Sequence, residues 1–116
     1  MLKWEESPAV YLFKRPVDMR CGFDRLAALV EAEVGKSPLQ GGLFAFVSRC
    51  RRRVKMLLWE RDGYWLFYKR LEVGTFRVEE REGVEELRGV DLKLLLEGTE
   101  LSRIKFRKEM EKSVYS

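Results

Sequence analysis

Residues 43–78 read LFAFVSRCRRRVKMLLWERDGYWLFYKRLEVGTFRV, the most strongly patterned stretch of this 116-residue chain. Two runs rich in aromatic and aliphatic side chains, residues 53–60 and 64–71, flank Asp62-Gly63. Asp-Gly favours a two-residue hairpin loop, because these residues tolerate positive φ. Shorter runs at 43–48 and 75–79 extend the pattern. We therefore interpret the stretch as an antiparallel meander of four strands.

With Asp62-Gly63 as the loop, Trp59 lies opposite Leu66 and Lys55 lies opposite Arg70. Apolar pairs then occur on both faces of the hairpin. A strand with only one buried face should instead alternate apolar and polar residues. We therefore expect both faces to be covered, by a helix, another chain or nucleic acid.

The segments on either side of the meander predict its cover. Residues 9–13 (AVYLF) favour a short strand, and residues 22–34 favour a helix with one apolar face. Asp18 and Cys21 are the two candidates for the N-cap of this helix, and Asp18 is chemically the better one. Gly35 is its C-terminal stop. Residues 80–89 are acidic and indicate a loop with a short strand. Asp91 would cap a short helix over residues 91–97.

Together these patterns predict an α+β fold in a single domain, residues 1–116. The expected sheet is an antiparallel meander of four to five strands. A longer helix at 22–34 and a short helix at 91–97 pack on it. Residues 102–116 are expected to form a mobile tail.

Composition excludes several classes. No apolar run reaches 18 residues, and the N-terminus lacks the apolar core of a secretory signal, so we expect a cytoplasmic protein without membrane contact. Cys21 and Cys50 have no CxxC spacing, and the chain has no His, so an ordinary zinc site is not expected. No nucleotide-binding motif occurs, and no cofactor is predicted.

Charge is divided along the chain. Residues 43–71 carry a net charge of +6 and residues 72–100 carry −5. The densest positive cluster is RCRRRVK at residues 49–55, and Lys69 and Arg70 return beside it. Guanidinium groups match phosphate oxygens bidentately, which points to nucleic acid. The plainer interpretation is a solvated basic turn that limits aggregation of an apolar hairpin. We favour nucleic-acid contact through the residues Arg49, Arg51, Arg52, Arg53, Lys55, Lys69 and Arg70.

Aromatic residues interleave with this positive charge. Basic residues among aromatics can form a stacking platform for single-stranded nucleic acid. The core of the sheet needs the same side chains, and we favour the core interpretation. The residues concerned are Phe44, Phe46, Trp59, Tyr64, Trp65, Phe67, Tyr68 and Phe76.

Catalytic chemistry has little support. Metal-dependent nucleases need two or three acids that converge on a divalent ion. Of the four Asp, Asp62 and Asp91 already have structural roles, and Asp18 and Asp24 would not share a helix face. The absence of His removes an imidazole general base. We predict that the protein is not an enzyme; an unrecognised nuclease using Asp18 or Asp24 is the minor alternative.

Six blocks in order resemble a known family: PVDMR (16–20), GFDRLAALV (22–30), GLFAF (42–46), VKMLLWERDG (54–63), FYKRLEVGTF (67–76) and LLLEG (94–98). They are similar to the small accessory protein, called TnpB or Orf2, that insertion sequences of the sixty-six type encode beside their transposase. The resemblance covers about residues 9–101. It implies a compact α+β protein without a recognised catalytic motif, needed with the transposase for efficient transposition.

The resemblance places basic residues between the Leu-Phe-x-Phe and Leu-Trp strands, where Arg49 to Lys55 stand here. The family's connector tends to contain Gly-Asp, and this chain departs from it with Cys50-Arg51-Arg52-Arg53. We therefore predict a non-catalytic accessory protein that binds DNA near element ends beside its transposase. The alternative is an adaptor whose oppositely charged segments dock on the transposase or on a second copy, without direct DNA contact.

Overall fold

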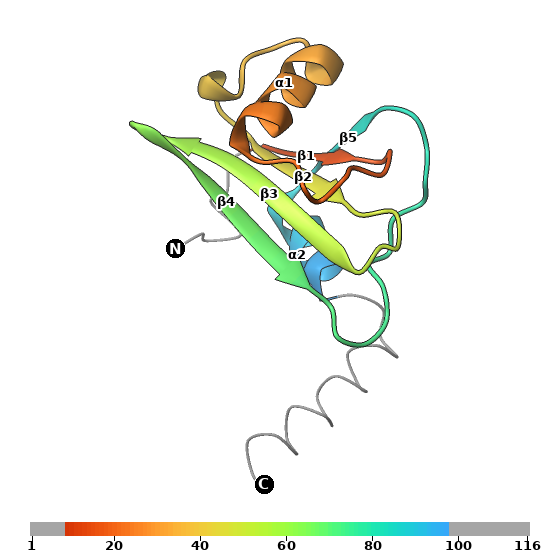
Figure 1. Cartoon of the computed structure of the whole chain (residues 1–116). Coiled ribbons are helices and arrows are strands. Elements are labelled where there is room, and N and C mark those ends of the chain that lie inside the picture. Colours follow the sequence, from red (N-terminus) through yellow and green to blue (C-terminus); the bar gives the residue numbers. More distant parts are fainter. Residues whose placement is uncertain (1–8, 98–116) are drawn as a thin grey trace, which may run out of the picture.

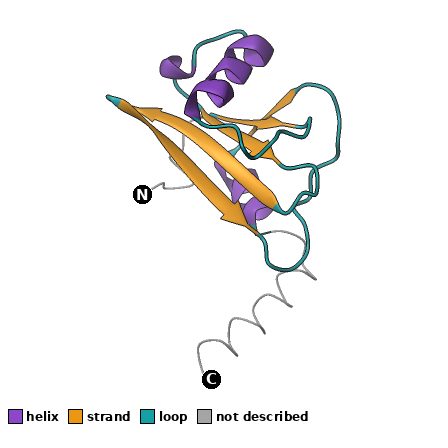
Figure 2. Ribbon diagram, viewed as in Figure 1, coloured by secondary structure: helices purple, strands orange, loops and turns teal. Residues whose placement is uncertain are grey.

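The computed structural model describes residues 9–97 (Figure 1). Five strands and two α-helices make an α+β fold, with a short 3₁₀ helix before the second strand (Figure 2). In chain order these elements are β1 (Val10–Phe13), α1 (Phe23–Val34), η2 (Pro38–Gln40), β2 (Leu43–Val47), β3 (Arg53–Glu60), β4 (Gly63–Arg70), β5 (Val84–Leu87) and α2 (Gly89–Leu96). The predicted tail at 102–116 lies outside the described residues.

The five strands form one sheet in the order β4-β3-β2-β1-β5. Strands β2, β3 and β4 make three of the four strands of the predicted antiparallel meander. The wholly antiparallel sheet was a wrong prediction, because β1 pairs with β2 in parallel. The connection between them contains α1, as a parallel pair requires a crossover long enough to return the chain to the same end of the sheet. Strand β5 then pairs antiparallel with the free side of β1.

Helix α1 follows the sequence prediction closely. Leu26 and Val30 are fully buried, and Gly35 ends the helix in the left-handed conformation at φ 81°. Its amide donates to the carbonyl of Glu31. Asp18 is not its N-cap: Gly22 holds that position, without a side-chain hydrogen bond. The carboxylate of Asp18 instead accepts from Arg20, two residues on.

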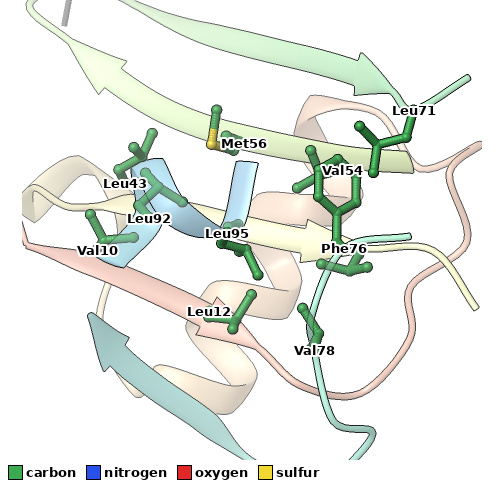
Figure 3. Packing of buried hydrophobic residues seen from close by; sticks show 12 residues of the cluster. Val10, Leu12, Leu43, Val54, Met56, Leu71, Phe76, Val78, Leu92 and Leu95 are labelled. Atoms are coloured by element: carbon green, nitrogen blue, oxygen red, sulfur yellow. The ribbon is translucent and has the colours of Figure 1, made fainter. Parts of the chain in front are cut away.

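Each face of the sheet carries its own core. On one face α1 packs over an aromatic cluster that includes Phe13, Phe44 and Phe46. On the other face Leu92 and Leu95 of α2 pack against aliphatic strand residues (Figure 3). Figure 1 shows the two helices on opposite sides of the sheet. A helix therefore covers part of each face, which is one of the three kinds of cover expected from the sequence (a helix, another chain or nucleic acid).

The β3–β4 hairpin has a different register from the predicted one. Glu60 pairs with Gly63, so the loop is Arg61-Asp62, and Arg61 takes the positive φ of 55°. Every partner shifts by two positions, which keeps each side chain on its expected face. Lys55 consequently faces Tyr68, and the predicted Lys55–Arg70 pair is wrong.

Residues after β4 differ most from expectation. Residues 75–79 do not form a strand, although Phe76 and Val78 are buried as the alternation indicated. The long loop after β4 passes the β2–β3 turn at the end of the sheet and leads to β5 at the opposite edge (Figure 2). Helix α2 begins earlier than predicted, with Arg88 rather than Asp91 at its N-cap. Asp91 lies in its first turn and pairs with Arg88 at 3.4 Å.

Candidate nucleic-acid interface

The turn between β2 and β3, residues 48–52, is closed by Ser48. This side chain is buried at 7% exposure, and its hydroxyl accepts the amide of Arg53 at 3.1 Å. The Ser48 amide donates to the Arg53 carbonyl, and the Arg51 amide donates to the Ser48 carbonyl. The backbone of Arg51 has φ 59°, a left-handed conformation that residues other than Gly adopt only at a cost in free energy. The tight turn projects consecutive arginines from one end of the sheet.

The same turn anchors the loop that follows β4. The amide of Phe76 donates to the Arg51 carbonyl, and the amide of Leu71 donates to the Arg52 carbonyl, both at 2.7 Å. The Arg51 guanidinium donates to the carbonyl of Val78 at 3.1 Å. Arg51 is thus tied to the loop. These backbone and side-chain bonds hold the loop that places Phe76 and Val78 in the core. Figure 3 shows both side chains within the buried cluster.

An open cavity of about 1170 Å³ lies at this end of the sheet. Three segments meet around it: the loop after β1 (residues 16–20), the β2–β3 turn and the end of β4 (residues 68–72). The amide of Val17 donates to the carbonyl of Val47, which fixes the first segment beside the second. Five arginines line the cavity, namely Arg20, Arg49, Arg52, Arg53 and Arg70. Two carboxylates, Asp18 and Glu72, line it as well.

Arg53 and Arg70 stand opposite each other in the β3–β4 ladder. Like charges in directly opposed positions destabilise a sheet. Arg70 is paired with Glu72 at 2.7 Å, which raises the pKa of its guanidinium. For the Arg53 side chain, no ion pair or hydrogen bond occurs within residues 9–97. A like-charge pair therefore occurs in the ladder, but it joins Arg53 to Arg70 and is not the predicted Lys55–Arg70 pair.

The loop after β1 adds a pair of opposite charges. Arg20 donates to both carboxylate oxygens of Asp18, the shortest contact being 2.7 Å. These side-chain bonds, helped by the Arg20 amide, lower the pKa of Asp18 from 3.8 to about 2. Both groups are exposed, so solvent screens much of the attraction. The pair is ionised at neutral pH, and the Arg20 side chain remains 92% exposed at the rim.

Four of the seven predicted contact residues donate to backbone carbonyls within the chain. Arg52, which lines the cavity, donates to the carbonyl of Glu72 at 3.1 Å, and the other three lie outside the cavity. Arg51 donates to Val78, Lys55 donates to the carbonyl of Cys21 at 2.9 Å, and Lys69 donates to the carbonyl of Leu96 at 2.7 Å. Lys55 also lies over the ring of Tyr68, 5.3 Å from its centroid. The Leu96 carbonyl is one of the last in α2, where a cation is favourable. These three bonds hold elements together, and none of the three residues lines the cavity.

The aromatic residues divide between core and surface. Phe44, Phe46 and Phe76 are buried, in agreement with the favoured core interpretation. Tyr68 is 54% exposed and lines the cavity, and Trp65 is 56% exposed on the edge strand. The stacking alternative thus retains one candidate, Tyr68, beside the arginines.

Two residues of this cavity were underweighted by sequence reasoning. Arg20 is not among the contact residues predicted from the sequence, and Tyr68 was interpreted as core. The signal for Arg20 is the order strand, helix, strand over residues 10–47: a parallel pair brings the loops after β1 and β2 to the same edge. That arrangement predicts that residues 16–20 meet residues 48–52.

Cysteine and carboxylate chemistry is limited in the described part of the chain. No group of three or more His, Cys, Asp and Glu residues that could hold a metal ion occurs there. Cys50 is an exposed thiol in the cavity wall. A hydrogen bond with the Ser48 hydroxyl and the amide of Arg52 lower its pKa. Among residues 9–97, no helix is both long and apolar enough to span a bilayer.

Comparison with known proteins places the chain. Residues 8–106 match the family described as IS66 Orf2-like protein. The chain belongs to this family. It is 36% identical over 83 residues to the uncharacterized protein y4hO of Sinorhizobium fredii (strain NBRC 101917 / NGR234), covering 72% of each chain. It is 30% identical over 92 residues to the uncharacterized protein y4jC of the same strain, covering 78% of this chain and 79% of the relative. No solved structure matches.

Membership in the IS66 Orf2-like family confirms the resemblance and supports an accessory role in transposition. Both relatives are uncharacterized, so their names add nothing about contacts. The DNA-contact residues stay a prediction, now centred on the basic cavity.

Proposed function

We propose that this IS66 Orf2-like protein is a non-catalytic accessory protein of transposition that grips DNA phosphates in its basic cavity. One observation carries the proposal: five arginines from three separate segments line a single open cavity. Two carboxylates also line the cavity, and Glu80 outside it pairs with Arg49, which leaves an excess of two positive charges. Such an excess is stabilised by a bound polyanion, and guanidinium groups suit phosphate.

Arg53 is the central residue of this proposal. It stands opposite Arg70 at the strand ends, and its guanidinium has no counter-ion within the described residues. A phosphate between the two strands would relieve the repulsion between Arg53 and Arg70. Arg49 and Arg52 extend from the turn, and Arg20 extends from the opposite rim. Phosphate contacts of this kind position a protein on DNA without reading sequence.

Ion pairs within the chain bear on the adaptor alternative. Arg49 lies 3.8 Å from Glu80, Lys14 lies 3.2 Å from Glu85, and Arg15 lies 3.9 Å from Glu82. The acidic segment thus partly neutralises basic residues of its own chain. This reduces the charge available for head-to-tail docking, so we favour direct DNA contact. The transposase remains a proposed partner at the same DNA.

The test is fluorescence anisotropy on a labelled duplex from the element's end, titrated with salt. We expect salt-sensitive binding whose log–log slope falls by about one in the Arg53→Ala variant. Arg77→Ala is the matched control, because Arg77 is equally charged and exposed but lies outside the cavity. An equal loss in both variants would show general charge attraction instead of a cavity. No binding by the wild-type protein at low salt would overturn the proposal.

A further inference from the structure

Strand β4 is the outer edge of the sheet, and within residues 9–97 nothing pairs with its free side. Figure 1 shows this strand along one margin of the molecule. Natural proteins shield long edge strands with prolines, bulges, inward charges or a covering segment. Strand β4 has eight regularly paired residues and no proline. Charge is confined to its last two positions, Lys69 and Arg70.

The exposed edge is also aromatic. Trp65 is 56% exposed and stacks on Phe67, with ring centroids 6.2 Å apart, on the α2 face. Tyr68 is 54% exposed on the other face. Of the five large hydrophobic residues that are exposed in the described part of the chain, two belong to β4. An apolar edge with free backbone groups is the usual surface for strand addition.

We propose that a second copy of this chain occupies the edge, through antiparallel pairing of β4 with β4 about a two-fold axis at Leu66. In a hairpin with a two-residue loop, the flanking pair is hydrogen-bonded and such pairs recur at every second residue. Glu60 and Gly63 are that pair here. The amide and carbonyl groups of Tyr64, Leu66 and Tyr68 therefore point outward, as the register at Leu66 requires.

Charge and side-chain complementarity argue for a second copy as the occupant. In this register Leu66 meets Leu66 of the second copy. Trp65 meets Phe67, and Tyr64 meets Tyr68, so the aromatic pairs that stabilise antiparallel strands form on both faces. Asp62 at the loop comes opposite Arg70 of the second copy, an opposite-charge pair. No like charges face each other. The two-fold axis would also place both basic cavities on the same face of a joined sheet.

The association has a signature opposite to that of DNA binding. Each chain carries a net charge of +4, so the copies repel, and salt should strengthen their association. Binding to phosphates should weaken with salt. Failure of one proposal therefore leaves the other intact. Sedimentation velocity and fluorescence anisotropy together distinguish a protein that dimerises through β4 without binding DNA from one that binds DNA as a monomer.

The experiment is sedimentation velocity of the full chain over a concentration series, with and without added salt. We expect a monomer–dimer equilibrium in which Trp65→Lys weakens association at least about tenfold, because it removes the largest apolar contact. Asp62→Arg should also weaken it, by setting like charges opposite each other. Leu39→Lys is the matched control, since Leu39 is 52% exposed on η2, away from β4.

Amide hydrogen exchange tests the register itself. Exchange at Tyr64, Leu66 and Tyr68 should slow as protein concentration rises, while Trp65 and Phe67 stay equally protected throughout. A monomer at every concentration would overturn the proposal. A dimer that Trp65→Lys and Leu39→Lys affect equally, or whose protection lies outside β4, would overturn it as well.

Discussion

The two turns at the ends of β3 share a backbone conformation but are stabilised by different contacts. Each places an arginine at positive φ, Arg51 at 59° and Arg61 at 55°. The first turn is held by bonds to a loop more than twenty residues away, including the contact of Arg51 with Val78. The second is closed locally, with the Asp62 amide donating to Glu60 at 2.7 Å. The first turn is therefore part of the tertiary structure, and the second only reverses the chain.

The largest effect should come from the residue that the first turn holds in the core. Phe76 is 1% exposed, and its amide donates to the Arg51 carbonyl. Phe76→Ala should lower the free energy of unfolding by about 3–5 kcal/mol, through lost burial and the cavity left behind. Chemical denaturation measures it. Phe23→Ala is the control, because Phe23 is 45% exposed and should cost about 1 kcal/mol or less. Equal costs would contradict the role assigned to the first turn.

The arginine side chains should separate the turns next. Arg51→Ala removes the charged donor to the Val78 carbonyl, and we expect a loss of about 1–2 kcal/mol in unfolding free energy. Arg61→Ala removes an exposed side chain that makes no ion pair or hydrogen bond within residues 9–97, and it should change stability by about 0.5 kcal/mol or less. Thermal or urea unfolding of the two variants under identical conditions makes the comparison. A larger cost at Arg61 would reverse our assignment of the anchored turn.

Substitution by glycine should change stability in opposite directions at the two turns. A left-handed residue other than Gly costs about 1–2 kcal/mol, and Gly recovers part of this while losing more entropy on folding. Arg61→Gly should therefore stabilise the protein by about 0.5 kcal/mol. Arg51→Gly gains the same relief but loses the bond to Val78, so it should be neutral or destabilising. Stabilisation by both substitutions would show that the Val78 bond contributes little.

The smallest effect concerns the local pair on the cavity rim. The depressed pKa of Asp18, about 2 against 3.8, means that its ionised form is favoured in the folded state. Its stabilisation is complete above about pH 4 and disappears as the pH falls through 2. The stability difference between wild type and Asp18→Asn should shrink over that interval. NMR titration of the Asp18 carboxyl measures the pKa directly, and a value near 3.8 would contradict the pairing.

Local patterns predicted most elements of this fold. The apolar face of residues 22–34 specified α1, and the paired apolar runs specified the meander. The Asp-Gly turn preference did not predict the hairpin register, because it assigned the loop and its positive φ to Asp62-Gly63. The observed loop instead places Met56 opposite Phe67 and Leu57 opposite Leu66, so core pairing outweighed turn preference. Turn propensity is worth less than several buried cross-strand pairs.

The candidate site was predicted in part. Density of positive charge identified Arg49, Arg52 and Arg53, and the return of β4 added Arg70. Charge density could not show that four of the predicted residues donate to carbonyls, because those acceptors lie in distant segments. The four are Arg51, Arg52, Lys55 and Lys69. Arg20 depends on the parallel pairing of β1 and β2, which needs the whole topology. Contacts that are distant in sequence are the part that pattern alone misses.

The position of β1 in the sheet also dictates an order of folding. Strands β3 and β4 are joined by two residues and can pair within microseconds. Strand β1 must wait for β2, about thirty residues later, and then for β5, more than seventy residues later. Closing such loops slows folding. Of the five strands, β1 would leave the ribosome first and would gain its second partner last. We therefore expect the rate-limiting step of folding to be the insertion of β1 between β2 and β5.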